Sequence, residues 1–125
     1  MNKKIILTGK APAPIGPYSQ AVLAGGFLFC SGQIALDAKG QIIGQDVETQ
    51  TKQVMMNVGE VLKAADLGFD HVIKTTIFLK NMADFPKVNE IYGTYFKGSF
   101  PARSTVEVAR LPKDVLVEVE IVALV

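Results

Sequence analysis

The C-terminal stretch 115–125, VLVEVEIVALV, constrains the fold more than any other part of the chain. Its alternation predicts a strand with one wholly apolar face, formed by Val117, Val119, Ile121, Ala123 and Val125. The other face would carry Glu118 and Glu120 together with Val122 and Leu124. A strand with apolar side chains on both faces belongs inside a sheet that is covered on both sides.

Two further strands are predicted around a tight turn near the N-terminus. Residues 18–24 and 27–36 are short apolar runs that flank Gly25-Gly26, which is typical of a β-hairpin. The preceding segment 11–20, APAPIGPYSQ, holds three prolines and predicts an ordered but irregular arm. A second turn is expected at 37–40, DAKG.

A helix is predicted from Asp46, because apolar residues recur at helical spacing along one face: Val47, Val54, Met55, Val58, Leu62 and Ala65. Asp46 can cap its N-terminus, and Gly68 can supply a left-handed C-terminal stop. Met55 and Met56 are expected to fill space in the core.

A strand over 71–80 and a second helix are predicted to follow. Ile73, Ile77 and Leu79 would share one face of the strand. The helix would be capped by Asp84 and ended by Gly98, with an apolar stripe formed by Phe85, Val88, Tyr92, Tyr95 and Phe96. A strand at 104–109 would precede the C-terminal one.

The order strands, helix, strand, helix, strands predicts an α+β fold in a single domain over residues 1–125. Two helices can cover only one face of such a sheet. The other face, also supplied with apolar side chains by residues 27–30, therefore needs a cover from outside the chain. We expect an oligomer.

Composition excludes several classes of partner. With 13 basic and 12 acidic side chains the net charge is +1, so the chain has no excess of positive charge for nucleic acid or anionic lipid. No stretch reaches the ~18 uncharged apolar residues of a membrane span. The lone Cys30 and the absence of an export signal lead us to expect a cytoplasmic protein.

Four side chains are candidates for binding and chemistry. Arg103 at the start of a strand could bind a planar carboxylate, or it could simply lie over Phe100 at the surface. Glu118 and Glu120 share one side of a mostly apolar strand, and either could act as a general acid or base, form a salt bridge or face solvent. Asn89, in the stripe of the second helix, could face a pocket or bond to a loop carbonyl.

Other kinds of chemistry lack their residues. One histidine, His71, and one cysteine provide no zinc site, no Cys-His pair and no Ser-His-carboxylate triad. No glycine-rich phosphate-binding motif is present. We expect neither a metal site nor a nucleotide or dinucleotide cofactor.

Four segments together resemble the RidA (YjgF-type) family of reactive-intermediate deaminases over essentially the whole chain. They are IGPYSQA at 15–21, SGQIALD at 31–37, residues 75–96, and FPARSTVEVARLPKD at 100–114. The resemblance implies a chorismate-mutase-like α+β protomer, with a mixed sheet and two helices on one face, assembled as a homotrimer with clefts at the subunit interfaces. It also implies cofactor-free hydrolysis of 2-imino or enamine acids to 2-oxo acids and ammonia.

The resemblance assigns roles position by position. Arg103 resembles the arginine that pairs with the substrate carboxylate, and Glu118 the glutamate that positions the attacking water. The other matched positions of the substrate pocket are Tyr18, Ser31, Gly32, Asn89 and Thr105. Thr105 stands where many members of the family have cysteine, so a role that needs that thiol would be absent or altered here.

There are two alternatives to a deaminase, of which one follows from the same residues and the other is a function attached to similar proteins. A cleft with an arginine binds carboxylates whether or not a reaction follows, so a non-catalytic sensor or regulatory binding module is one alternative. A ribonuclease or translation inhibitor is the other, and the near-neutral charge and single histidine argue against it.

Overall fold

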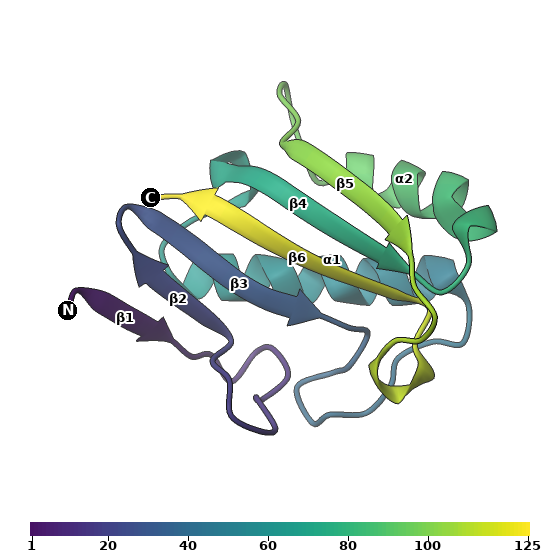
Figure 1. Ribbon diagram of the computed structural model, residues 1–125, viewed down its shortest axis with the longest axis horizontal. Coiled ribbons are helices and arrows are strands. Elements are labelled where there is room, and N and C mark those ends of the chain that lie inside the picture. The colour runs from purple at the N-terminus through teal and green to yellow at the C-terminus, as the bar shows by residue number, and fades with distance from the viewer.

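Six strands form one sheet in the computed structural model, which describes residues 1–125 (Figure 1). Their bounds are β1 (Lys3–Ile6), β2 (Ala21–Ala24), β3 (Phe27–Gln33), β4 (Val72–Leu79), β5 (Ala102–Glu107) and β6 (Val117–Leu124). The spatial order is β1-β2-β3-β6-β4-β5, in which only the pair β4 and β5 is parallel. The C-terminal strand therefore lies inside a mixed sheet, as its two apolar faces predict.

Two helices, α1 (Val47–Ala64) and α2 (Phe85–Gly93), pack against the same face of this sheet (Figure 1). The core between them contains the alternate residues of β6 that face the helices, Val117, Val119, Ile121 and Ala123. Val125, predicted to continue that face, lies beyond the strand and is exposed. The α+β class, with a mixed sheet and two helices on one face, is confirmed.

The opposite face of the sheet is not covered within the chain. The strand registers place Ile5, Phe29, Val106 and Leu124 on that face, and each of them is exposed. Exposed apolar side chains gathered on one sheet face are the usual mark of an interaction surface. Assembly through this face, including the homotrimer, remains a prediction. No helix is both long enough and apolar enough to cross a bilayer.

The Gly25-Gly26 hairpin is confirmed, since both glycines have positive φ, 60° and 84°, as a mirror-image two-residue turn requires. Asp37 Oδ1 accepts bonds from the backbone N–H groups of Lys39 and Gln41, which forms the predicted second turn. Strand β1 was not predicted, because Lys3 and Lys4 interrupt the apolar pattern at this edge of the sheet.

The predicted N-terminus of α1 is confirmed, and its predicted C-terminal stop is not. Asp46 caps the helix, and its Oδ2 accepts from Thr49 N at 2.8 Å. Gly68 as the left-handed stop is wrong, because Asp66 takes that conformation with φ 60°, two residues earlier. A short polar side chain such as aspartate tolerates this region of φ/ψ better than most residues do.

Helix α2 ends at Gly93, so Gly98 does not end it, and Tyr95 and Phe96 belong to the following loop. They still pack on the core, with the Phe96 ring centroid 4.9 Å from that of Tyr92. The side chain of Asp84 makes no capping bond. Asn81 instead caps the short turn before the helix by accepting from Ala83 N at 2.9 Å.

Two residues differ from prediction: Ile73, expected to share a face with Ile77 and Leu79, and Met56, expected in the core. Ile73 is 42% exposed because the pairing of β4 with β6 shifts register between Val72 and Lys74, which breaks the alternation shared with Ile77 and Leu79. Met56 is 57% exposed on the outer side of α1, whereas its neighbour Met55 is buried.

Candidate functional site

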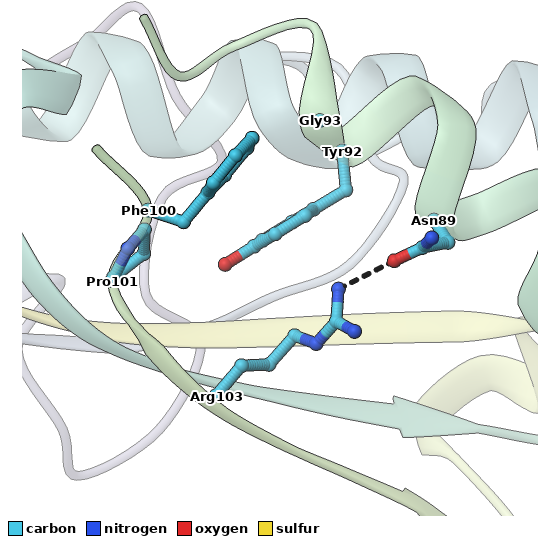
Figure 2. A pocket seen from close by; sticks show the side chains of 6 residues that line it. All are labelled: Asn89, Tyr92, Gly93, Phe100, Pro101 and Arg103. Atoms are coloured by element: carbon cyan, nitrogen blue, oxygen red, sulfur yellow. Dashed lines mark hydrogen bonds between the residues drawn. The ribbon is translucent and has the colours of Figure 1, made fainter. Parts of the chain in front are cut away.

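Two cavities lie on opposite faces of the sheet. The first, of about 410 Å³, opens between β5 and α2 and is lined by Asn89, Tyr92, Gly93, Phe100, Pro101 and Arg103 (Figure 2). The second, of about 670 Å³, lies beside the N-terminal arm, and its lining includes Tyr18, Ser31, Gly32, Lys113, Glu118 and Glu120. Every predicted site residue except Thr105 lines one of these two cavities.

Arg103 extends from β5 toward α2, and its guanidinium lies against aromatic rings. Its Cζ is 5.0 Å from the ring centroid of Phe85 and 5.1 Å from that of Tyr92. Nη1 donates to Asn89 Oδ1 at 2.6 Å (Figure 2). The guanidinium therefore does not lie over Phe100, and its other N–H groups remain free to bind a planar anion through two parallel bonds.

The sequence of α2 explains this arrangement. Phe85, Asn89 and Tyr92 are spaced i, i+4 and i+7, so they lie on the same side of the helix. One helical face thus supplies two rings and one amide acceptor to the same arginine. Asn89 faces the first cavity, which is one of its two predicted alternatives, and its hydrogen-bond partner is Arg103 rather than a loop carbonyl.

Tyr92 is itself held from the core. Its hydroxyl is hydrogen-bonded to Thr75 Oγ1 of β4 at 2.8 Å. Burial raises the pKa of the Tyr92 phenol, while the Thr75 hydrogen bond and the Arg103 charge lower it to a smaller extent. The phenol stays neutral at physiological pH.

Thr105 follows Arg103 by two residues on β5 and so points to the same side of the sheet. Its Oγ1 is buried and has no hydrogen-bond partner in the chain. A buried hydroxyl without a partner costs free energy, so this group is available to a ligand or to a neighbouring molecule.

Glu118 lies in the second cavity beside Glu120, which is two residues along β6 on the same side. Burial, and then the charge of Glu120, raise the pKa of the Glu118 carboxyl above its usual value. Gly32 leaves room for this carboxyl, because a Cβ at position 32 would stand 2.9 Å from Glu118 Cδ. Glu118 is therefore a stronger base than an ordinary surface glutamate.

The N-terminal arm forms one wall of this cavity and is tied down by Gln20. The Gln20 amide accepts from Thr8 N at 2.7 Å and donates to Thr8 O at 3.0 Å and Pro12 O at 2.9 Å. The Ser31 hydroxyl donates to Ser19 O at 2.6 Å. Its hydrogen is thus used to hold the arm, which presents Tyr18 at the cavity.

The predicted site residues fall into two groups that one chain does not bring together. Arg103 pairs with Thr75, whose side chain is buried against α2, whereas Glu118 pairs with Phe78. Thr75 and Phe78 are separated by an odd number of positions on β4 and point to opposite sides. Arg103 and Thr105 therefore lie on the helix side of the sheet, together with Asn89 of α2. Glu118 lies on the other side, together with Tyr18, Ser31 and Gly32.

Three residues that support the site were not predicted as site residues: Phe85, Tyr92 and Gln20. Phe85 and Tyr92 were predicted only as part of the apolar stripe of the helix, although their spacing with Asn89 is the signal that could have revealed their contact with Arg103. Gln20 is only 1% exposed. It carried no such signal, because its partners Thr8 and Pro12 lie in irregular backbone.

Comparison with known proteins places the chain in a family. Residues 8–125 match the family model described as Endoribonuclease L-PSP. A RutC family protein of Synechocystis is 60% identical, covering 98% of this chain and 97% of that protein. The 2-iminobutanoate/2-iminopropanoate deaminase of Mus musculus is 51% identical, covering 97% of this chain and 90% of that protein.

A solved structure agrees over nearly the same length. The crystal structure of E. coli TdcF with bound serine superposes with a TM-score of 0.93 at 42% identity, covering 98% of each chain. The sequence match and the structural match both extend over the strands and helices that carry the two cavities. The chain therefore belongs to the YjgF/RidA family, the family that its motifs resemble.

Proposed function

We propose that this chain hydrolyses 2-imino acids, and the enamine acids in equilibrium with them, to 2-oxo acids and ammonia. The observation that carries the proposal is that the chain contains both Arg103, a guanidinium with free donors, and Glu118, a carboxyl of raised pKa. The chain is also 51% identical to a protein named as such a deaminase. Because these two groups face opposite sides of the sheet, we propose that each cleft forms between two copies in a homotrimer.

In this proposal Arg103 binds the substrate carboxylate through two parallel N–H bonds, while its bond to Asn89 fixes one N–H group of the guanidinium. Thr105 contributes its unpaired hydroxyl from the same strand. Tyr18, Ser31 and Gly32 of the neighbouring copy close the cleft around the imine carbon. A small amino or imino acid matches this set, and TdcF is a relative whose crystal structure contains bound serine.

The reaction needs one water molecule and one base. Glu118, as a carboxylate, accepts a proton from water as the water oxygen bonds to C2 of the imine, and the C=N π bond breaks onto nitrogen. Glu118 then returns the proton to nitrogen, which gives a carbinolamine with a C2 hydroxyl and an amino group. Glu118 next takes the hydroxyl proton and passes it to the amino nitrogen, so that the C–N bond breaks, ammonia leaves and the C2–O bond becomes a carbonyl. The sum is imine plus water giving 2-oxo acid plus ammonia.

No cofactor is required by this chemistry. A C=N bond beside a carboxylate already reacts with water, so orienting the substrate and one water molecule supplies the gain. The raised pKa of Glu118 makes its carboxylate a stronger base toward the attacking water.

Subunit complementation provides the sharpest test. Arg103→Ala and Glu118→Gln would each be inactive toward freshly generated 2-iminobutanoate when assayed alone. Mixed assemblies refolded from equal amounts of both variants should regain activity, because roughly a quarter of their clefts would combine an intact Arg103 with an intact Glu118. Mixtures that stay as inactive as the separate variants would contradict a shared cleft.

The alternative of a non-catalytic carboxylate sensor is separated by Glu118→Gln. In an enzyme this variant should lose ammonia release yet keep binding of 2-oxobutanoate, measured by calorimetry, because Arg103 is untouched. A wild-type protein that binds 2-oxobutanoate but never accelerates imine hydrolysis would favour the sensor. RNA cleavage by repurified protein, lost on Arg103→Ala, would favour the ribonuclease.

A further inference from the structure

The Arg103 guanidinium contacts a tyrosine that is itself fixed inside the protein. Tyr92 is 3% exposed and Thr75 is fully buried, and their hydroxyls are hydrogen-bonded at 2.8 Å. No other hydrogen bond is made by either side chain. This pair lies directly beneath the only charged group of the first cavity.

The sheet register brings the three residues together. Thr75 of β4 pairs with Arg103 of β5, so both side chains start from directly opposite backbone positions and point toward α2. Tyr92 descends from α2 to meet both: its hydroxyl binds Thr75 and its ring lies 5.1 Å from Arg103 Cζ. The three side chains thus join α2 to two neighbouring strands.

The hydroxyl bond determines where the ring lies. A phenol ring can tilt about its two side-chain torsions, and a bond at its far end removes that freedom. A cation over an aromatic face is held most strongly when the ring stays under it, especially where water is excluded. Phe85, the other ring in contact with Arg103, has no polar end and packs only through its ring.

We propose that Thr75 and Tyr92 are positioning residues, which fix the Arg103 guanidinium in the orientation that binds the substrate carboxylate. This inference rests on the proposed function of Arg103 as the carboxylate anchor. Asn89 fixes one N–H group in the plane of the fork, and Tyr92 fixes the plane itself. The remaining donors then meet a carboxylate without first having to be ordered.

The kinetic test removes each hydroxyl separately. Tyr92→Phe and Thr75→Val should each raise KM for 2-iminobutanoate about three- to tenfold with kcat changed less than about twofold, since Glu118 is untouched. Thr75→Ser should restore the wild-type KM. The double variant should have a KM no higher than that of the more impaired single variant, because both substitutions break the same Thr75–Tyr92 hydrogen bond.

Tyr95→Phe is the matched control, because Tyr95 packs on Phe69 at 5.2 Å and makes no contact with Arg103. It should leave KM unchanged. Wild-type KM in both Tyr92→Phe and Thr75→Val, or a double variant with fully additive losses, would overturn the proposal. If Tyr92→Phe fails to fold, Thr75→Val and Thr75→Ser carry the same comparison.

A spectroscopic readout keeps this inference separate from the proposed function. The Nε–H signal of Arg103, assigned by comparison with Arg103→Lys, should be sharp in the wild-type protein and broadened in Thr75→Val but not in Thr75→Ser. A wild-type protein with this sharp signal and no deaminase activity would refute the function alone. Equal signals in the Val and Ser variants would refute the positioning role alone.

Discussion

Arg103 and Glu118 lie on strands separated only by β4, yet their side chains point to opposite faces of the sheet. Neither residue can reach a ligand held by the other within one chain. The arginine shares its side with α2, and the glutamate shares its side with the N-terminal arm. The proposed reaction therefore depends on contact between copies.

Asn89→Asp should weaken substrate binding. The new carboxylate would lie about where Asn89 Oδ1 accepts from Arg103, and it would compete with the substrate carboxylate for the same cation. We expect KM to rise about tenfold, equivalent to about 1.4 kcal/mol, with kcat little changed. Steady-state kinetics would measure this, and Asn2→Asp, which adds the same charge at an exposed position, is the control. An unchanged KM would contradict the role of Asn89.

Gly32→Ala should impair catalysis more than stability. The added methyl group would collide with the Glu118 carboxyl, whose Cδ would be 2.9 Å away, and would push it from its place in the cavity. We expect kcat to fall about tenfold or more, because a displaced base no longer reaches the water. Gly9→Ala is the control, since a Cβ there meets nothing within 4 Å. Equal kcat values for the two variants would disprove the collision.

Glu118→Gln should stabilise the protein at neutral pH. Burial raises the pKa of Glu118 above its unfolded value, so wild-type stability falls as pH rises from the unfolded to the folded pKa and stays low above it. The glutamine variant escapes this loss, and its Tm should exceed that of wild type by a few degrees at pH 7. The gain should vanish near pH ~3.5, below the unfolded pKa of about 4.3.

Glu90→Gln, at an exposed position, supplies the comparison for that experiment and should not alter Tm at pH 7. Thermal melts of all three proteins at both pH values would suffice. A glutamine variant at position 118 that is less stable than wild type at pH 7 would mean that the carboxylate is stabilised by a partner.

Cys30 should resist thiol reagents in the folded protein. It is buried, and burial raises the pKa of its thiol to about 12, so almost no thiolate exists at pH 8. We expect Ellman's reagent to react slowly with native protein and fast after unfolding in guanidinium chloride. Reaction of the native protein at the unfolded rate would show that β3 opens readily.

The fold was predictable wherever a local pattern determined it. The alternation of residues 115–125 gave the buried central strand, and the spacing of apolar residues after Asp46 gave α1. The predictions failed where backbone geometry departed from the simplest rule: Asp66 rather than a glycine took the left-handed position, and a register shift turned Ile73 outward.

The site was predictable as a set of residues but not as an arrangement. Motifs identified Arg103, Asn89 and Glu118, while the side of the sheet that each one faces depends on the pairing of β5 and β6 with β4. That pairing joins segments tens of residues apart in sequence and leaves no local signal. The place of Thr75 beside Arg103 depends on the same pairing, whereas the helical spacing of Tyr92 with Asn89 was a local signal.

Strand β6 has almost no side that is free to vary. Its odd-numbered residues from Val117 to Ala123 fill the core under α1, and Glu118 and Glu120 line the second cavity on the reverse side. Random substitution along these positions should therefore be tolerated least of any segment, with losses of stability alternating with losses of activity at every second residue. A deep mutational scan of this strand, with stability and activity measured separately, would show this period of two residues.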